Sequence, residues 1–231
     1  MLASMPVPGP AFRGRLRVVA AVVPLVALSG CAGLGQPAPY EQPGINGLVI
    51  PTPSPDPDDF VDVVDNPWLA FEPGTDRSYD VTGAEGDLDV EVLADTTEVA
   101  GLTATGVRTV SDIGGEVTDE TRYYAQDDDG NVWLVAVESD TGLSWRAGVD
   151  GAEAGLAMPA DPRLGDGWLT YRVPNLLRAT TMIEDLSREM VQTRESTGGD
   201  ADTTVRVYAA GTGLVSIEDP DAGWQARLVR E

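Results

Sequence analysis

The residue types that could carry chemistry in this chain are few. All fifteen basic residues are Arg, there is no Lys and no His, and the single cysteine is Cys31. These absences exclude Ser-His-Asp and Cys-His nucleophile systems, imidazole metal ligands, lysine Schiff bases and the phosphate-binding lysine of a P-loop. Chemistry would have to come from Asp and Glu, Tyr, Ser and Thr, Arg, or a metal bound through oxygen.

Carboxylates are the most abundant of these groups, with 38 acidic residues in a chain of 231. Two of them could in principle hydrolyse a glycosidic bond, but the sequence marks no two as convergent. The formal net charge of −23 disfavours binding to nucleic acid or adsorption to an anionic membrane. We therefore expect no nucleic-acid partner.

One acidic stretch, Asp127–Asn131, is similar to part of a calcium-binding loop. With Gly130 at position 6 of an EF-hand loop, positions 1 and 12 fall on Ala125 and Ala136, so both terminal ligands are missing. The stretch instead predicts a hairpin turn in which Gly130 adopts a positive φ. We expect no metal and no cofactor.

A second stretch, Trp145–Asp166, places four glycines and two prolines among apolar residues. Its glycine spacing does not fit a dinucleotide-binding loop. We expect a long structured connection that either lines a ligand pocket or plugs one end of the fold. Because large apolar side chains are typical pocket contacts, the candidate ligand-binding residues are Trp133, Trp145 and Met158.

The first thirty residues have the pattern of an export signal. Arg13, Arg15 and Arg17 precede the apolar run Val18–Leu28, which is too short for the roughly 20 residues of a transmembrane helix. Leu28-Ser29-Gly30-Cys31 resembles the lipobox of bacterial lipoproteins. That resemblance implies cleavage before Cys31 and acylation of its sulfur; the alternative is an ordinary secreted protein.

We therefore divide the chain into a signal peptide (1–30), a lipidated Cys with a Pro- and Gly-rich tether (31–57) and one β-rich domain (58–231). Cleavage leaves twelve Arg against 38 acidic residues, a formal charge of −26. Because such a polyanion is repelled by an anionic bilayer, the lipid must supply the attachment. The expected location is the extracytoplasmic face of the cell membrane.

Beyond residue 58, β-branched and aromatic runs alternate with turn residues at the spacing of all-β proteins. In Asp87–Val92 the strict alternation places Leu88, Val90 and Val92 on a buried face. The fold class predicted is mainly β: an antiparallel meander that forms a curved half-barrel or closed β-barrel. The predicted strands are Arg77–Thr82, Asp87–Val99, Leu102–Ser111, Glu116–Gln126, Asn131–Ser139, Ser144–Ala147, Trp168–Val173, Val205–Ala209, Gly213–Glu218 and Trp224–Arg230.

One helix is expected within this β pattern, over residues 175–192. Leu176, Ile183 and Leu186 approximate a helical stripe, and Asn175 is a suitable N-cap after a proline. The run 179–183 would also suit a strand.

Three blocks resemble an uncharacterised family of secreted bacterial proteins. They are Val64–Trp68 (VDNPW) followed by Pro73-Gly74-Thr75, then Tyr124–Trp133, and then Trp145–Gly165 with its Met-Pro-Ala. The resemblance covers Val64 to Tyr171. It implies a shared fold and transfers no catalytic residue.

The favoured interpretation is a lipid-anchored extracytoplasmic module without catalysis, which binds an apolar or amphiphilic molecule or a cell-envelope partner. Two alternatives stay open. A carboxylate-dependent hydrolase of envelope glycans would need two carboxylates facing each other about 5–10 Å apart. A purely structural envelope lipoprotein would need neither pocket nor cleft.

Overall fold

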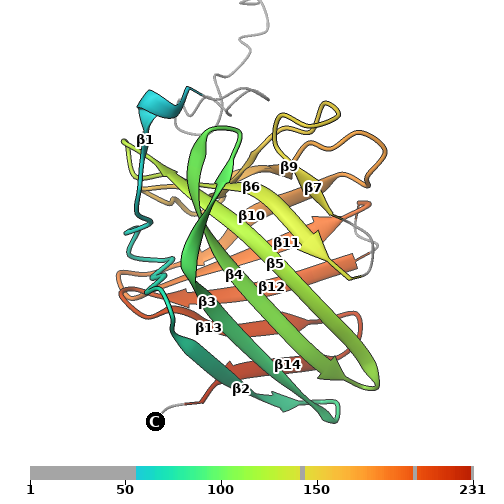
Figure 1. The fold of residues 1–231 in the computed structure, drawn as a ribbon. Helices are drawn as coiled ribbons and strands as arrows, with labels where there is room; N and C mark the ends of the chain where they lie inside the picture. The colour runs from blue at the N-terminus through green and yellow to red at the C-terminus, as the bar shows by residue number, and fades with distance from the viewer. Residues whose placement is uncertain (1–55, 141–143, 200–201, 230–231) are drawn as a thin grey trace, which may run out of the picture. The chain divides into compact units, whose positions relative to one another are not determined.

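The computed structural model describes residues 56–140, 144–199 and 202–229. The signal peptide, Cys31 and nearly all of the tether lie outside these residues. Within these ranges, a short 3-10 helix (Pro57–Asp59) precedes fourteen strands, which confirms the mainly β fold (Figure 1). The strands are β1 (Phe60–Val61), β2 (Asp76–Thr82), β3 (Gly86–Val99), β4 (Leu102–Ile113), β5 (Glu116–Asp127), β6 (Val132–Ser139), β7 (Trp145–Arg146), β8 (Gly155–Met158), β9 (Gly167–Tyr171), β10 (Ala179–Leu186), β11 (Met190–Thr197), β12 (Asp202–Ala209), β13 (Gly213–Asp219) and β14 (Trp224–Leu228).

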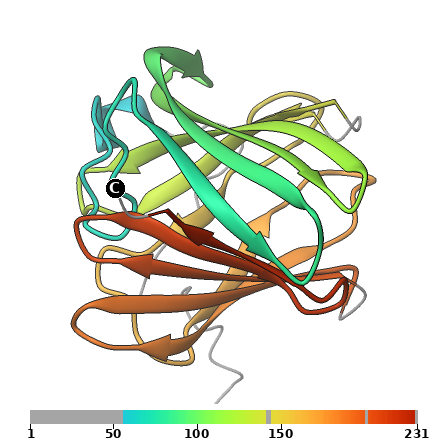
Figure 2. The same ribbon diagram turned by 90° about the horizontal axis from the view of Figure 1, so that it is seen from below.

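All fourteen strands belong to one antiparallel sheet. Its order is β7-β6-β5-β4-β3-β2-β14-β13-β12-β11-β10-β9, with β1 paired to β5 and β8 to β6. The sheet curls around an interior (Figure 2), and over the described residues no ladder pairs β7 with β9 to close it. An isolated bridge between Glu153 and Arg172 links its two ends. The predicted meander is therefore present as a curved, open half-barrel.

Tight turns and bulges produce this curvature. Ala100 and Gly101, with φ of 53° and 83°, form the two-residue turn between β3 and β4, the left-handed geometry that short hairpins favour. The β3–β4 ladder then shifts register between Val92 and Thr96, and other ladders shift at single points. Because a bulge bends its strand and increases the local twist, these shifts let the long hairpins curl.

The prediction of a helix over residues 175–192 is wrong. Most of that segment forms the hairpin of β10 and β11, in which Ala179, Thr181 and Ile183 are buried while the residues between them face outward. This period of two fits β-branched Thr and Ile, which pack better on a sheet than in a helix. Asn175 has a positive φ of 66° in the preceding turn and caps no helix.

Among the described residues, buried side chains gather in a large cluster, a smaller cluster at the other end of the strands, and a third group around Leu134 and Trp145. The large cluster joins the segment before β2 to β5, β6, β8 and β9, and includes Trp133, Met158 and Trp168. The smaller cluster joins β2, β3 and β4 to β13 and β14. Leu88, Val90 and Val92 are all buried, which confirms the face predicted from their alternation.

The sequence blocks described above converge beside the large cluster, where buried amides connect them. Gln126 Oε1 accepts from the backbone N–H groups of Asp65 and Asn66, at 3.0 and 2.9 Å. Asn66 Oδ1 accepts from the Trp68 N–H, and Asn66 Nδ2 donates to the Gly130 carbonyl. The first block is therefore fastened to the turn that follows β5.

The Asp127–Asn131 stretch is a hairpin turn, as predicted. The Asp127 carboxylate accepts from the backbone N–H and side-chain amide of Asn131, and from Trp133 Nε1 at 2.8 Å. Asn131 Oδ1 accepts in turn from the Ala160 N–H. This bond connects the turn to the third block, to which Ala160 belongs. We call Asn66, Gln126, Asp127 and Asn131 the motif cluster.

Replacement of Asp127 by Ala should destabilise the fold by about 2–3 kcal/mol, because it leaves the buried Asn131 amide and the buried indole N–H of Trp133 without their acceptor. Urea unfolding followed by circular dichroism measures the change. Asp129→Ala is the matched control, since Asp129 is exposed in the same turn. Equal stabilities of the two variants would contradict a structural role for the motif cluster.

Candidate functional site

The inner face of the curved sheet holds a cavity of about 350 Å³, which we call the interior cavity. This volume lies within the range of about 300–1,000 Å³ that is common for small-molecule sites. One side of its lining is mainly apolar and comes from β2, β3, β4, β13 and β14. That side consists of Tyr79, Leu88, Val90, Val92, Val107, Ile113, Leu214, Ile217 and Trp224.

The other side of the interior cavity is polar and comes mainly from the inward positions of β4, β5 and β12. It consists of Thr109, Ser111, Thr118, Glu120, Arg122, Thr204 and Arg206. Alternate residues of β5 point inward, so Glu120, Arg122 and Tyr124 share this face. The Ser111 and Thr118 hydroxyls hydrogen bond to each other at 2.7 Å.

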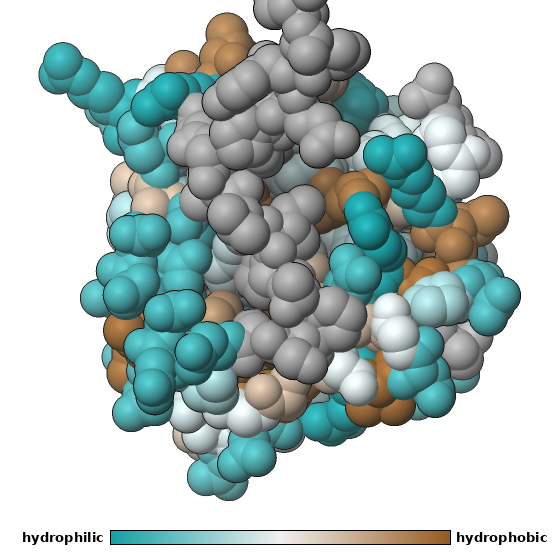
Figure 3. Space-filling view, turned by 90° about the horizontal axis from the view of Figure 1, so that it is seen from above, coloured by the Kyte–Doolittle hydropathy of each residue, from teal (hydrophilic) through white to brown (hydrophobic). Residues whose placement is uncertain are grey.

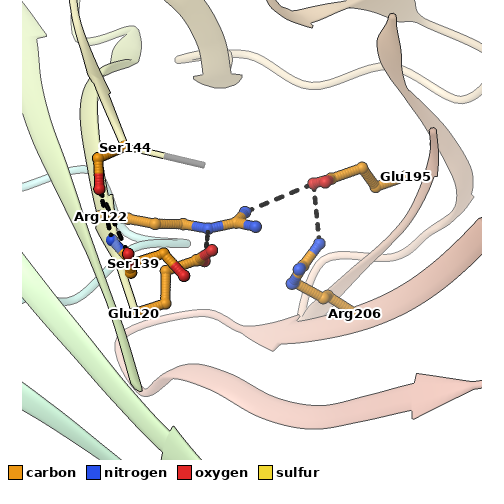
Figure 4. A network of polar contacts seen from close by, with 6 residues as sticks. All are labelled: Glu120, Arg122, Ser139, Ser144, Glu195 and Arg206. Atoms are coloured by element: carbon orange, nitrogen blue, oxygen red, sulfur yellow. Dashed lines mark hydrogen bonds and ion pairs between the residues drawn. The ribbon is translucent and has the colours of Figure 1, made fainter. Parts of the chain in front are cut away.

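Four charged side chains cross the interior and form what we call the interior charge network (Figure 4). Arg122 Nε donates to Glu120 Oε1 at 2.6 Å, and its Nη1 lies 3.6 Å from Glu195 Oε2. Arg206 Nη1 donates to the same Glu195 oxygen at 3.0 Å. The network thus ties β5 to β11 and β12, which are distant from β5 in the strand order.

The electrostatics of the network keep its members charged. The Glu195 side chain is only 12% exposed, and burial by itself would raise its pKa, but Arg206 and Arg122 together lower that pKa below its ordinary value. Burial likewise opposes the charge of Arg122, yet Glu120 and Glu195 raise its pKa well above the usual value. The interior therefore holds two ion-paired Glu–Arg units.

Burial also affects the phenols around the interior cavity. It raises the pKa of Tyr79 to about 12, and the Tyr79 hydroxyl donates to the Leu214 carbonyl at 2.9 Å. It raises the pKa of Tyr124 to about 12 as well, and Tyr124 packs on Phe71 with ring centroids 5.1 Å apart. Both phenols are neutral at physiological pH and offer polar edges on apolar bodies.

The three ligand-binding residues predicted from the sequence lie elsewhere. Trp133 and Met158 are almost wholly buried in the large cluster, and Trp145 is buried against Tyr171, with ring centroids 5.6 Å apart. The structure brings Trp133 and Met158 together, but none of the three lines the interior cavity. Their contact with a ligand stays a prediction.

Sequence reasoning missed Arg122, Glu195 and Arg206. A signal was present in the predicted strand Glu116–Gln126, where the inward positions from residue 116 to 122 carry Glu, Thr, Glu and Arg. A half-buried strand with no apolar face indicates a polar interior. The partners on β11 and β12 lie more than 70 residues away along the chain, so no local pattern connects them.

The network limits the chemistry that its carboxylates can perform. Glu120 and Glu195 flank one guanidinium, and the lowered pKa of Glu195 opposes the proton-holding role of a general acid in glycoside hydrolysis. Over the described residues, no group of three or more His, Cys, Asp or Glu side chains is placed to hold a metal ion. The arrangement is better suited to hydrogen bonding than to proton transfer.

Comparison with family models, curated proteins and solved structures gave no match to this chain. In the described ranges, no helix is both long enough and apolar enough to cross a membrane. Hydrophilic residues cover much of the coloured surface in Figure 3, with hydrophobic residues in small separate groups. The interior cavity is therefore the site we consider for function.

Replacement of Glu195 by Gln should lower the free energy of unfolding by about 2 kcal/mol at pH 7, because it removes the negative charge between two half-buried arginines. Since the pKa of Glu195 is lowered in the fold, its contribution is complete above the unfolded value of 4.5 and is lost as the pH falls through the folded value. Urea unfolding from pH 7 to pH 3 should show the two proteins converging below about pH 4.5.

The control for this comparison is Glu189→Gln, because Glu189 is an exposed turn residue and forms no ion pair among those that the described residues make. It should leave the stability unchanged across the range. A constant difference between wild type and Glu195→Gln at all pH values would refute the electrostatic role of Glu195.

Proposed function

We propose that this protein is a lipid-anchored extracytoplasmic binding module, without catalysis, that holds an amphiphilic molecule in the interior cavity. The observation that carries the proposal is the mixed lining of this cavity, in which apolar side chains, paired charges and hydroxyls border the same space. An apolar stem would lie along Val90, Val107 and Ile217. A polar group would lie toward Arg122 and Arg206.

Packing physics supports the use of the interior cavity. Protein interiors are normally filled to the density of organic crystals, and a lining that loses contact with neighbouring atoms costs stability in proportion to the void. The bulk of the core packs well at the other end of the strands, around Trp133 and Met158. A space of this size beside a well-packed core is characteristic of a ligand site.

The lipobox supports the proposed location. A diacylated Cys31 supplies the two acyl chains that stable anchoring generally requires, and the strongly acidic domain would otherwise be repelled from an anionic bilayer. An anchored module with an interior site is well placed to hold amphiphilic molecules of the cell envelope.

Filling the interior cavity tests the proposed site. In the full chain carrying Cys31→Ser, Val107→Trp should weaken binding of the neutral fluorescent probe N-phenyl-1-naphthylamine at least tenfold, because the indole would occupy the apolar side. Val117→Trp is the control, since Val117 is 66% exposed on the neighbouring strand. Probe fluorescence measures both affinities, and circular dichroism verifies the folds. Equal binding by the two variants would place the probe outside the cavity.

Replacement of Cys31 by Ser tests the anchor. The wild-type chain, expressed in a bacterium that processes lipoproteins, should fractionate with membranes, and Cys31→Ser should move to the soluble extracytoplasmic fraction. Ser29→Ala keeps a small residue in the lipobox and serves as the control that stays with membranes. Unchanged fractionation of Cys31→Ser would reject lipid anchoring.

A further inference from the structure

The charges that surround the interior cavity largely cancel. Its lining contains three arginines, Arg77, Arg122 and Arg206, and three acidic residues, Glu116, Glu120 and Asp219. Within the interior charge network, two arginines face two carboxylates and the formal charge is zero. In a chain with a net charge of −23, this balance is a local property of the interior.

The network keeps both donor groups and acceptor groups that form no hydrogen bond within it. Of the hydrogen bonds made among described residues, Arg206 uses only Nη1, so its Nε–H and Nη2–H groups keep their donor capacity. Glu120, which lines the interior cavity, accepts from Arg122 with Oε1 alone among these bonds, so its Oε2 keeps acceptor capacity. The side chain of Arg206 is 18% exposed and that of Arg122 is 25% exposed, and both line the interior cavity.

Hydroxyl groups extend this mixed surface along the polar side. Thr109, Ser111 and Thr118 follow one another across β4 and β5, and Thr204 lies on β12. Each hydroxyl can both donate and accept. Tyr79 and Trp224 line the same cavity, and aromatic side chains offer flat apolar surface with a polar edge.

We propose that the bound amphiphile has a neutral, hydroxyl-rich head group, such as a sugar ring, on an apolar stem. This inference rests on the proposed function and names the class of ligand for the same site. A polyhydroxylated head satisfies the remaining donors of Arg206 and the remaining acceptor of Glu120 without adding charge.

Charged head groups fit the interior less well. An anionic head would compete with Glu120 and Glu195 for arginines that these carboxylates already hold, and it would approach the acids Glu116 and Asp219. A cationic head would face Arg122 and Arg206. In both cases the ligand would bury an unbalanced charge, which is costly away from water.

The test compares three amphiphiles with the same eight-carbon stem and different heads. Isothermal titration calorimetry of the full chain carrying Cys31→Ser, at pH 7 and below micelle-forming concentrations, would measure n-octyl β-D-glucopyranoside, octanoate and octyltrimethylammonium. We expect the glucoside to bind at least tenfold more tightly than either charged amphiphile. Val107→Trp should weaken glucoside binding at least tenfold.

The interior charge network can be unbalanced to test its part in this preference. Glu195→Gln makes the network positive and should raise the affinity for octanoate relative to the glucoside at least fivefold. Glu184→Gln is the matched control, because Glu184 pairs with Arg194 between the adjacent strands β10 and β11, away from the residues that line the cavity. It should leave the order of affinities unchanged.

The outcomes separate this inference from the proposed function. If octanoate or octyltrimethylammonium binds as tightly as the glucoside or more tightly, the neutral head group is wrong while the binding module stands. If none of the three binds, the proposed function is wrong and the inference falls with it. If Glu195→Gln does not fold, the wild-type ranking alone decides.

Discussion

The fold depends on charge pairing across the interior of a curved sheet. Glu195 on β11 lies between Arg122 on β5 and Arg206 on β12, so strands that are remote in the sheet are connected through its concave side. Half-buried charges are tolerated only when they are paired and hydrogen-bonded. This connection therefore fixes the distance between β5 and the strands β11 and β12. Because these side chains keep β5 apart from β11 and β12, they leave room for a cavity.

The two ends of the interior have different physical roles. At one end the motif cluster joins three separated chain segments through buried amides and one carboxylate, beside a densely packed core of Trp133, Met158 and Trp168. At the other end, apolar residues and the interior charge network surround open space. The motif blocks therefore specify the fold, while residues outside these blocks line most of the cavity.

Local patterns in the sequence predicted most of the fold. Alternation over Asp87–Val92 and the turn residues of Asp127–Asn131 depend on neighbours along the chain, and both predictions are confirmed. The segment 175–192 was misassigned because its apolar spacing fits two periodicities, and pairing with β9 and β11 decides between them. The interior charge network was not predicted, because Arg122 and Glu195 meet only after the sheet curls. The sequence predicts ligand contacts at large apolar residues, and the structure places two of these, Trp133 and Met158, in the large cluster.

The most direct measurement of the central claim is a crystal structure of the chain grown with n-octyl β-D-glucopyranoside. We expect the alkyl stem to lie against Val90 and Val107, and the sugar ring to lie within hydrogen-bonding distance of Arg206 and Glu120. An interior that contains only water, with the glucoside bound on the outer surface or absent, would contradict the assignment of the cavity as a binding site.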